Sequence, residues 1–124
     1  QFPLTTIHKN AYRDAIAALC GAEQGKYVEY KKALYALEDT KNWATVSDED
    51  RVNAAKEAGL DGADMEVCLA SNRYQAQVDS DMAYGNTLRV EWTPTVILDG
   101  KKLDLGVFRD IDMLAKFLDR IVAE

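Results

Sequence analysis

The stretch that most constrains the fold of this chain is residues 90–106, VEWTPTVILDGKKLDLG. Pro94 has no N–H and a fixed φ, and the start of a strand is one of the few sheet positions that tolerate it. Thr95–Leu98 is β-branched or aliphatic and uncharged, which is typical of a buried strand. Asp99–Gly100 is a strong two-residue turn signal, and residues 101–105 alternate polar and apolar as an edge strand does. The sequence therefore predicts a β-hairpin entered through a Thr-Pro dipeptide.

With 124 residues, the chain has room for one domain with a single modest core. The net charge of −6 and the scattered basic residues argue against a nucleic acid as partner, because such a surface needs clustered Lys and Arg. No apolar run approaches the roughly 20 residues that cross a bilayer. The first residues also lack the basic region and apolar core of a signal peptide, so we expect any export signal to have been removed.

The spacing of apolar residues predicts several helices ahead of the hairpin. We expect helices over residues 8–20, 23–37, 48–58 and 72–88, and a short one after Asp61 that bears Cys68. Gly21 is positioned to end the first helix as a C-cap. The polar residues 38–46 predict a loop, with Trp43 as its anchor to the core.

Other local signals mark helix starts and one further strand. Ser47, followed by three acidic residues, is typical of a capped helix start. Phe2–Leu4, held extended by Pro3, predicts the end of a strand. Asp110 caps a final amphipathic helix, in which the side chains expected to face inward are Ile111, Leu114, Phe117, Leu118 and Ile121. The predicted fold class is α/β and rich in helix, with too few strands for a complete sheet.

The two cysteines, Cys20 and Cys68, lie far apart and form no CxxC motif. Because the sequence has one histidine, they cannot assemble a zinc site from Cys and His, and we expect no metal. The residues alone leave two interpretations open. The cysteines are either separate buried thiols, which behave as small hydrophobic groups, or one disulfide that places the chain in an oxidising compartment.

Five short segments, in this order along the chain, match the pattern of one protein family. They are Phe2-Pro3-Leu4 with His8 and Asn10-Ala11, Cys20 with Gln24-Gly25-Lys26-Tyr27, Gly59-Leu60-Asp61 with Cys68-Leu69, Val90-Glu91-Trp92-Thr93-Pro94-Thr95, and Asp99-Gly100. In these segments the chain resembles the DsbA-like thioredoxin-fold proteins, which are thiol–disulfide oxidoreductases of the bacterial cell envelope. The similarity runs nearly from end to end.

The chain also departs from the family pattern. In the family, a strand and a helix that begins with the redox-active CxxC precede the matching region, and this sequence holds no CxxC. The resemblance therefore implies a single, incomplete domain over residues 1–124 with a thioredoxin-like fold. A DsbA-type helical insertion would occupy residues 8–88, and a hairpin plus C-terminal helix residues 90–124. Trp92 stands where the family usually has Gly, which would change the shape of the substrate groove.

The resemblance also implies roles for individual residues. The Thr93–Pro94 peptide bond would be cis, and the backbone around it would pair with an extended substrate. The groove residues would be Trp92, Thr93, Pro94 and Thr95. Cys20 and Cys68 would form the structural disulfide that many members carry in the helical insertion. Neither cysteine has a cationic cluster beside it in sequence, so we expect no catalytic residue in this chain. We expect His8 to be structural, and no cofactor.

The implied activity is dithiol–disulfide exchange on exported proteins or peptides that contain cysteine, in the periplasm or another extracytoplasmic space. Because exchange needs a nucleophilic thiolate, we expect the chain to be inactive alone. The alternative is a non-catalytic module that binds peptides or proteins in the Thr-Pro groove. Further expected partners are a membrane redox protein, a complementing N-terminal segment, or a second copy that pairs with the exposed strand.

Overall fold

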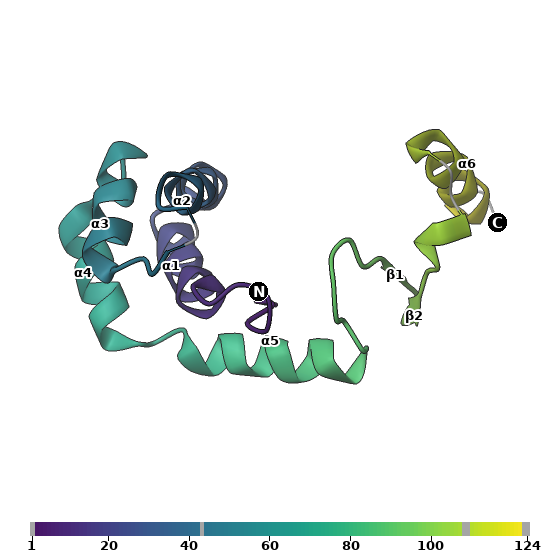
Figure 1. The fold of residues 1–124 in the computed structure, drawn as a ribbon, viewed down its shortest axis with the longest axis horizontal. Coiled ribbons are helices and arrows are strands. Elements are labelled where there is room, and N and C mark those ends of the chain that lie inside the picture. The colour runs from purple at the N-terminus through teal and green to yellow at the C-terminus, as the bar shows by residue number, and fades with distance from the viewer. Residues whose placement is uncertain (1, 43, 108–109, 123–124) are drawn as a thin grey trace. The chain divides into compact units, whose positions relative to one another are not determined.

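The computed structural model describes residues 2–42, 44–107 and 110–122 of the chain. The chain divides into two compact units, Gln1–Thr87 and Leu88–Glu124. Among the described residues, the first unit consists of α-helices, and the second contains a hairpin, a short 3₁₀ helix and one α-helix (Figure 1). The predicted excess of helix over strand is therefore confirmed.

The first unit is arranged around its first helix. The helices are α1 (Ala11–Glu23), α2 (Tyr27–Thr40), α3 (Asp48–Glu57), α4 (Gly62–Ser71) and α5 (Gln75–Thr87). α1 contacts each of the other four. The buried residues of α1 are mostly small, and small side chains let several helices approach one axis. The largest fully buried side chains of the surrounding core are Ile16, Tyr30, Met65, Leu69 and Val78.

Two predicted helix starts are confirmed in atomic detail. The Ser47 hydroxyl accepts a hydrogen bond from the Asp50 N–H at 3.1 Å, and the Asp50 carboxylate accepts one from the Ser47 N–H at 3.0 Å. Lys41 and these Ser47 bonds lower the pKa of Asp50 to about 2. At the start of α4, the Asp61 carboxylate accepts from the Ala63 and Asp64 N–H groups.

The prediction that Gly21 ends the first helix is wrong. α1 continues to Glu23, and Gly21 is a buried residue inside it. A Cβ atom on Gly21 would lie 2.6 Å from Cδ1 of Tyr30, which belongs to the facing helix α2. Gly21 is therefore required by the close approach of two helices, and Gly25, which has a φ of 71°, provides the turn that follows α1.

Two other local expectations are also wrong. α2 continues to Thr40, so residues 38–40 are helical and not part of a loop. Trp43, the expected anchor of that loop, lies outside the described residues. Phe2–Leu4 forms no strand: the described residues hold one two-stranded sheet, which pairs residues 97–98 with residues 101–102. Instead, the Phe2 ring packs against Gly85, where an added Cβ would lie 2.4 Å from ring carbons.

The second unit contains little buried surface. β1 (Ile97–Leu98) pairs antiparallel with β2 (Lys101–Lys102), and η1 (Leu105–Val107) and α6 (Ile111–Val122) follow. The predicted cap of α6 is confirmed, because the Met113 N–H donates to the Asp110 carboxylate at 2.8 Å. The predicted inward face is confirmed in part: Leu114, Phe117, Leu118 and Ile121 are half-buried, whereas Ile111 is 74% exposed and no residue of α6 is fully buried. A hairpin of two-residue strands is too small to cover an amphipathic helix.

A disulfide joins Cys20 of α1 to Cys68 of α4, with an S–S distance of 2.04 Å. Both residues are almost completely buried in the core, at 1% and 2% exposure. Of the two interpretations that the residues alone left open, the bonded pair is therefore correct.

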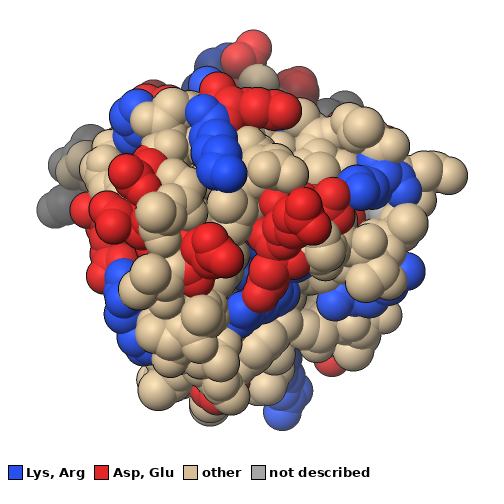
Figure 2. Space-filling model, turned by 90° about the vertical axis from the view of Figure 1, so that its left-hand side faces the viewer, with Lys and Arg blue, Asp and Glu red and all other residues tan. Residues whose placement is uncertain are grey.

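Acidic and basic side chains lie close together on one face of the helical unit. The face that α3 and α4 present carries acidic side chains beside Lys and Arg (Figure 2). One such pair joins Asp48 to Arg13, which donates from both Nε and a terminal nitrogen. Within the described part of the chain, no helix has the length and apolar character needed to cross a membrane.

The contact between Gly21 and Tyr30 is testable by adding one methyl group. We expect Gly21→Ala to lower the free energy of unfolding by about 1–3 kcal/mol, because the Cβ overlaps a buried ring. Urea denaturation measures the change. Ala22→Ser, at the neighbouring exposed position, is the control and should change stability by less than about 0.5 kcal/mol. Equal stabilities of Gly21→Ala and the wild type would contradict the packing described.

The disulfide is testable by removing both sulfur atoms. We expect the double variant Cys20→Ala/Cys68→Ala to lose roughly 4 kcal/mol of stability, the loop-entropy value for a closed loop of this length. The reduced wild-type protein should unfold at a similar urea concentration. A double variant that is as stable as the oxidised protein would show that the covalent link contributes nothing.

Candidate functional site

The turn of the hairpin positions the candidate site. Asp99 and Gly100 have φ values of 47° and 74°, as a two-residue turn with two left-handed positions requires. This turn pairs Leu98 with Lys101 and Ile97 with Lys102. The Leu103 N–H donates to the Val96 carbonyl at 2.9 Å, so the pairing continues for one further residue. The segment after the turn is thereby directed back towards the Thr-Pro dipeptide.

A pocket of about 380 Å³ lies between these two segments. It is lined by Trp92, Pro94, Thr95, Lys102, Leu103, Asp104, Leu105 and Gly106. Three of the four predicted groove residues therefore line one pocket, and Thr93 is outside the lining. The Thr93–Pro94 peptide bond is cis in the structure. Residues 92–94 are exposed and Thr95 is half-buried, so an extended ligand could reach their backbone.

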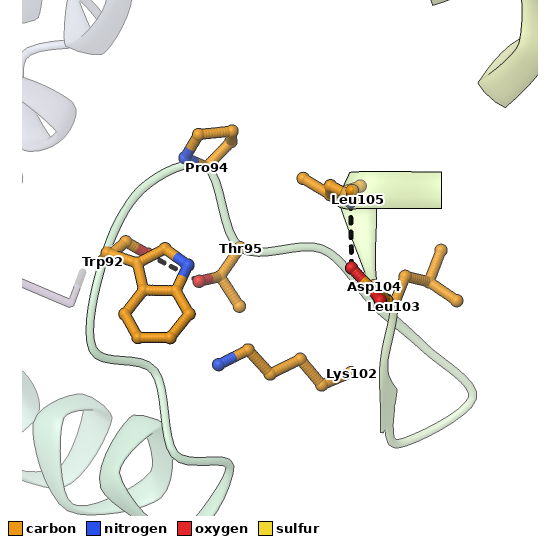
Figure 3. A pocket seen from close by; sticks show the side chains of 8 residues that line it. Trp92, Pro94, Thr95, Lys102, Leu103, Asp104 and Leu105 are labelled. Atoms are coloured by element: carbon orange, nitrogen blue, oxygen red, sulfur yellow. Dashed lines mark hydrogen bonds between the residues drawn. The ribbon is translucent and has the colours of Figure 1, made fainter. Parts of the chain in front are cut away.

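One wall of the pocket is a cation stacked on an aromatic ring (Figure 3). The Lys102 ammonium lies 4.3 Å from the centroid of the Trp92 ring. It also donates a hydrogen bond to the Arg89 carbonyl at 3.1 Å. The Thr95 hydroxyl donates to the Trp92 carbonyl at 2.5 Å, which closes the short loop between them. Trp92 is 54% exposed, so these contacts hold a large aromatic surface at the pocket mouth without burying it.

The lining residues 102–106 were not identified from the sequence as part of a site, because residues 101–105 were interpreted as an edge strand. The signal that could have located them is the turn. A two-residue turn at Asp99–Gly100 fixes the register, and its continuation sets Asp104 opposite Thr95. In the structure, the Asp104 carboxylate accepts from the Gly106 N–H at 2.9 Å, and both residues line the pocket.

Both cysteines belong to the first unit, whereas the groove residues belong to the second. Because both are in the disulfide, no free cysteine is present among the described residues, which include every cysteine of the chain. Within the same described residues, no group of three or more Asp, Glu, His or Cys side chains is placed to hold a metal ion. The arrangement offers a binding surface and a structural cross-link.

Comparison with known proteins identifies the family. A family model described as thioredoxin matches residues 1–120, which is nearly the whole chain. The chain belongs to the thioredoxin family. The mostly helical architecture with a small two-stranded sheet is compatible with a thioredoxin-like domain that has a large helical part. No solved structure matches the chain.

Curated relatives include much longer proteins. The chain is similar to a protein named Na(+)/H(+) antiporter NhaA 1 from Mycolicibacterium gilvum (strain PYR-GCK), with 28% identity over 101 residues. The match covers 82% of this chain and 16% of the relative. A protein of the same name from Mycobacterium sp. (strain KMS) shows the same identity and coverage. The chain thus spans less than a fifth of the length of these relatives.

The contact between Lys102 and Trp92 is testable by fluorescence. In a Trp43→Phe background, Trp92 is the remaining tryptophan. We expect Lys102→Gln to increase acrylamide quenching of Trp92, because the ammonium group no longer covers the ring face. The change in stability should be small, since an exposed cation–π contact contributes only about 0.5–1 kcal/mol. Lys101→Gln makes the same charge change at the adjacent residue and should leave quenching unchanged. The stacked arrangement is wrong if the two variants behave alike.

Proposed function

We propose that this chain is part of a DsbA-like thiol–disulfide oxidoreductase domain and that it has no exchange activity alone. The thioredoxin family match over residues 1–120 supports the general class. The order of the five matching sequence segments supports the DsbA-like specificity. In this proposal, the first unit is the helical insertion and the second is the groove-bearing end of the thioredoxin fold.

The observation that carries the proposed inactivity is the state of the two cysteines. Disulfide exchange begins when an accessible thiolate attacks a sulfur atom. Cys20 and Cys68 are the only cysteines of the chain, they are bonded to each other, and they are buried in the core. A substrate sulfur cannot reach this bond without unfolding of the helical unit. The catalytic CxxC would have to come from another segment or another chain.

The proposed contribution of this chain is substrate binding. Extended peptides can add to an exposed backbone edge by main-chain hydrogen bonds, and adjacent pockets then select side chains. Trp92, Thr93, Pro94 and Thr95 would supply that edge, and the apolar floor at Leu103 and Leu105 would receive a side chain. The substrates would be exported proteins or peptides that contain cysteine.

We place this activity in an extracytoplasmic compartment. A buried structural disulfide is typical of proteins that fold in oxidising surroundings. The chain is similar to part of proteins named as Na(+)/H(+) antiporters. This similarity also supports a location at a membrane, with this domain as one portion of a longer protein. A membrane redox partner would then renew the disulfide or dithiol of the complete enzyme.

The alternative is a non-catalytic binding module that uses the same groove within a membrane assembly. The small share of the antiporter relatives that the chain matches favours an accessory portion of this kind. The encoding gene discriminates between the two. An upstream CxxC segment supports the oxidoreductase, and a start codon directly before Gln1 supports the binding module.

An oxidative refolding assay tests the proposed inactivity. We expect reduced ribonuclease to regain activity no faster with this chain than in buffer, since its sulfur atoms are bonded and buried. A complete DsbA-type enzyme is the positive control, and the Cys20→Ala/Cys68→Ala variant is the matched negative control. Catalytic turnover by the wild type that the double variant lacks would refute the proposal.

A further inference from the structure

The pocket beside the Thr-Pro dipeptide has two charged side chains in its lining, and their surroundings differ. Asp104 Oδ1 accepts the Gly106 N–H at 2.9 Å, so the backbone already offsets part of its negative charge. Lys102 forms no ion pair with any acid of the described residues. The charge of Lys102 is therefore the one in this lining that a ligand of opposite charge can still neutralise.

Contacts with two residues hold the Lys102 ammonium in place. The side chain extends from β2 towards Trp92, where Nζ lies 4.3 Å from the ring centroid (Figure 3). Nζ also donates to the Arg89 carbonyl at 3.1 Å. An ammonium group has three N–H donors, and the Arg89 carbonyl takes one of them. Two donors therefore remain for an anionic group of a ligand, at a position that is set before the ligand binds.

Much of the remaining lining is apolar. Pro94, Leu103 and Leu105 belong to it, and the two leucines are half-buried. The volume of about 380 Å³ is near the lower end of the range for ligand pockets, about 300–1,000 Å³. A pocket of this size and composition suits an apolar side chain of a bound peptide.

The backbone next to the pocket is available for pairing with an extended peptide. Thr93 is exposed, and its N–H and carbonyl take part in no hydrogen bond among the described residues. Unpaired backbone groups of this kind can pair with an added strand. In a strand, residues two positions apart point to the same side and lie about 7 Å from each other. Every second side chain of a paired peptide therefore faces the same wall of the groove.

We propose that the groove selects peptides in which an apolar and an acidic residue are two positions apart. The apolar side chain occupies the apolar part of the pocket, and the acidic side chain accepts hydrogen bonds from Lys102. Trp92 and Lys102 are then the residues that determine specificity, through charge complementarity at a fixed position. This inference rests on the proposed function, because it requires that peptides bind beside Thr93.

The net charge of the chain limits the size of this preference. A net charge of −6 repels acidic peptides in general. At physiological ionic strength, exposed charges more than about 8 Å apart are largely screened, so the direct contact with Lys102 decides the outcome. An exposed ion pair changes affinity only about two- to fivefold. The expected selectivity is therefore modest, and added salt reduces it.

Peptide binding to the oxidised, full-length chain tests the preference. In the Trp43→Phe background, the fluorescence of Trp92 measures binding. The first peptide has leucine and glutamate two positions apart, the second has glutamine in place of that glutamate, and the third has the glutamate adjacent to the leucine. Each is made in both chain orders. We expect the first to bind about two- to fivefold more tightly than the others, and the difference to disappear in about 1 M NaCl.

Substitutions at two adjacent lysines identify the group responsible. We expect Lys102→Gln to bind the glutamate and glutamine peptides equally, and Lys102→Glu to prefer a lysine peptide of the same spacing. Lys101→Gln is the matched control and should keep the wild-type preference, because neighbouring strand residues point to opposite faces of β2. Both lysines are exposed, so the variants should fold, and an amide NMR spectrum verifies this.

The possible results separate this inference from the proposed function. If the wild type binds all three peptides with equal affinity, the acidic preference is refuted and peptide binding in the groove stands. A preference that survives Lys102→Gln, or that Lys101→Gln also removes, would refute the role of Lys102. If no peptide changes either the Trp92 fluorescence or the amide resonance of Thr93, the binding role in the proposed function fails as well.

Discussion

The Cys20–Cys68 disulfide is the constraint on which both the fold and the chemistry of this chain depend. It joins the central helix α1 to α4 within the core, so the helical unit is held together by a covalent bond as well as by packing. The same bond takes up the only two sulfur nucleophiles that the sequence contains. Stabilisation and loss of thiol reactivity thus have one cause. Under the proposed function, the chain would bind the substrate, and the reactive dithiol would come from another segment or another chain.

Much of the helical unit could be predicted because its signals are local. Ser47 with Asp50, and Asp61, cap helices through hydrogen bonds that span three residues, and these were found in the sequence. Gly21 was misinterpreted because its role depends on Tyr30, nine positions away on another helix. Phe2 was misinterpreted for the same reason, since its contact with Gly85 is distant in sequence. A glycine that ends a helix and one that admits a neighbouring ring look alike in a single sequence.

In the candidate site too, features set by neighbouring residues could be predicted, and features set by distant contacts could not. The turn at Asp99–Gly100 was predictable, and the register it fixes could have located Asp104 opposite Thr95. The stacking of Lys102 on Trp92 was not predictable, because the conformation of a long side chain is set by Arg89 as well as by the ring. The burial of Glu38 was missed because residues 38–46 were expected to form a loop. A carboxylate in a loop is solvated, whereas the same group in the last turns of a packed helix is buried.

The second unit shows why binding and catalysis would be linked in the proposed function. Two strands of two residues each bury little surface, and the apolar side chains of α6 remain at least partly exposed. Under the proposed function, one strand and one helix carrying the CxxC would extend this sheet. The added strand would pair with exposed backbone groups, and the enlarged sheet would cover α6. The segment that supplies the reactive thiols would therefore also complete the packing of the groove that receives the substrate. Catalytic competence and stability of this unit would then arise together from a single addition.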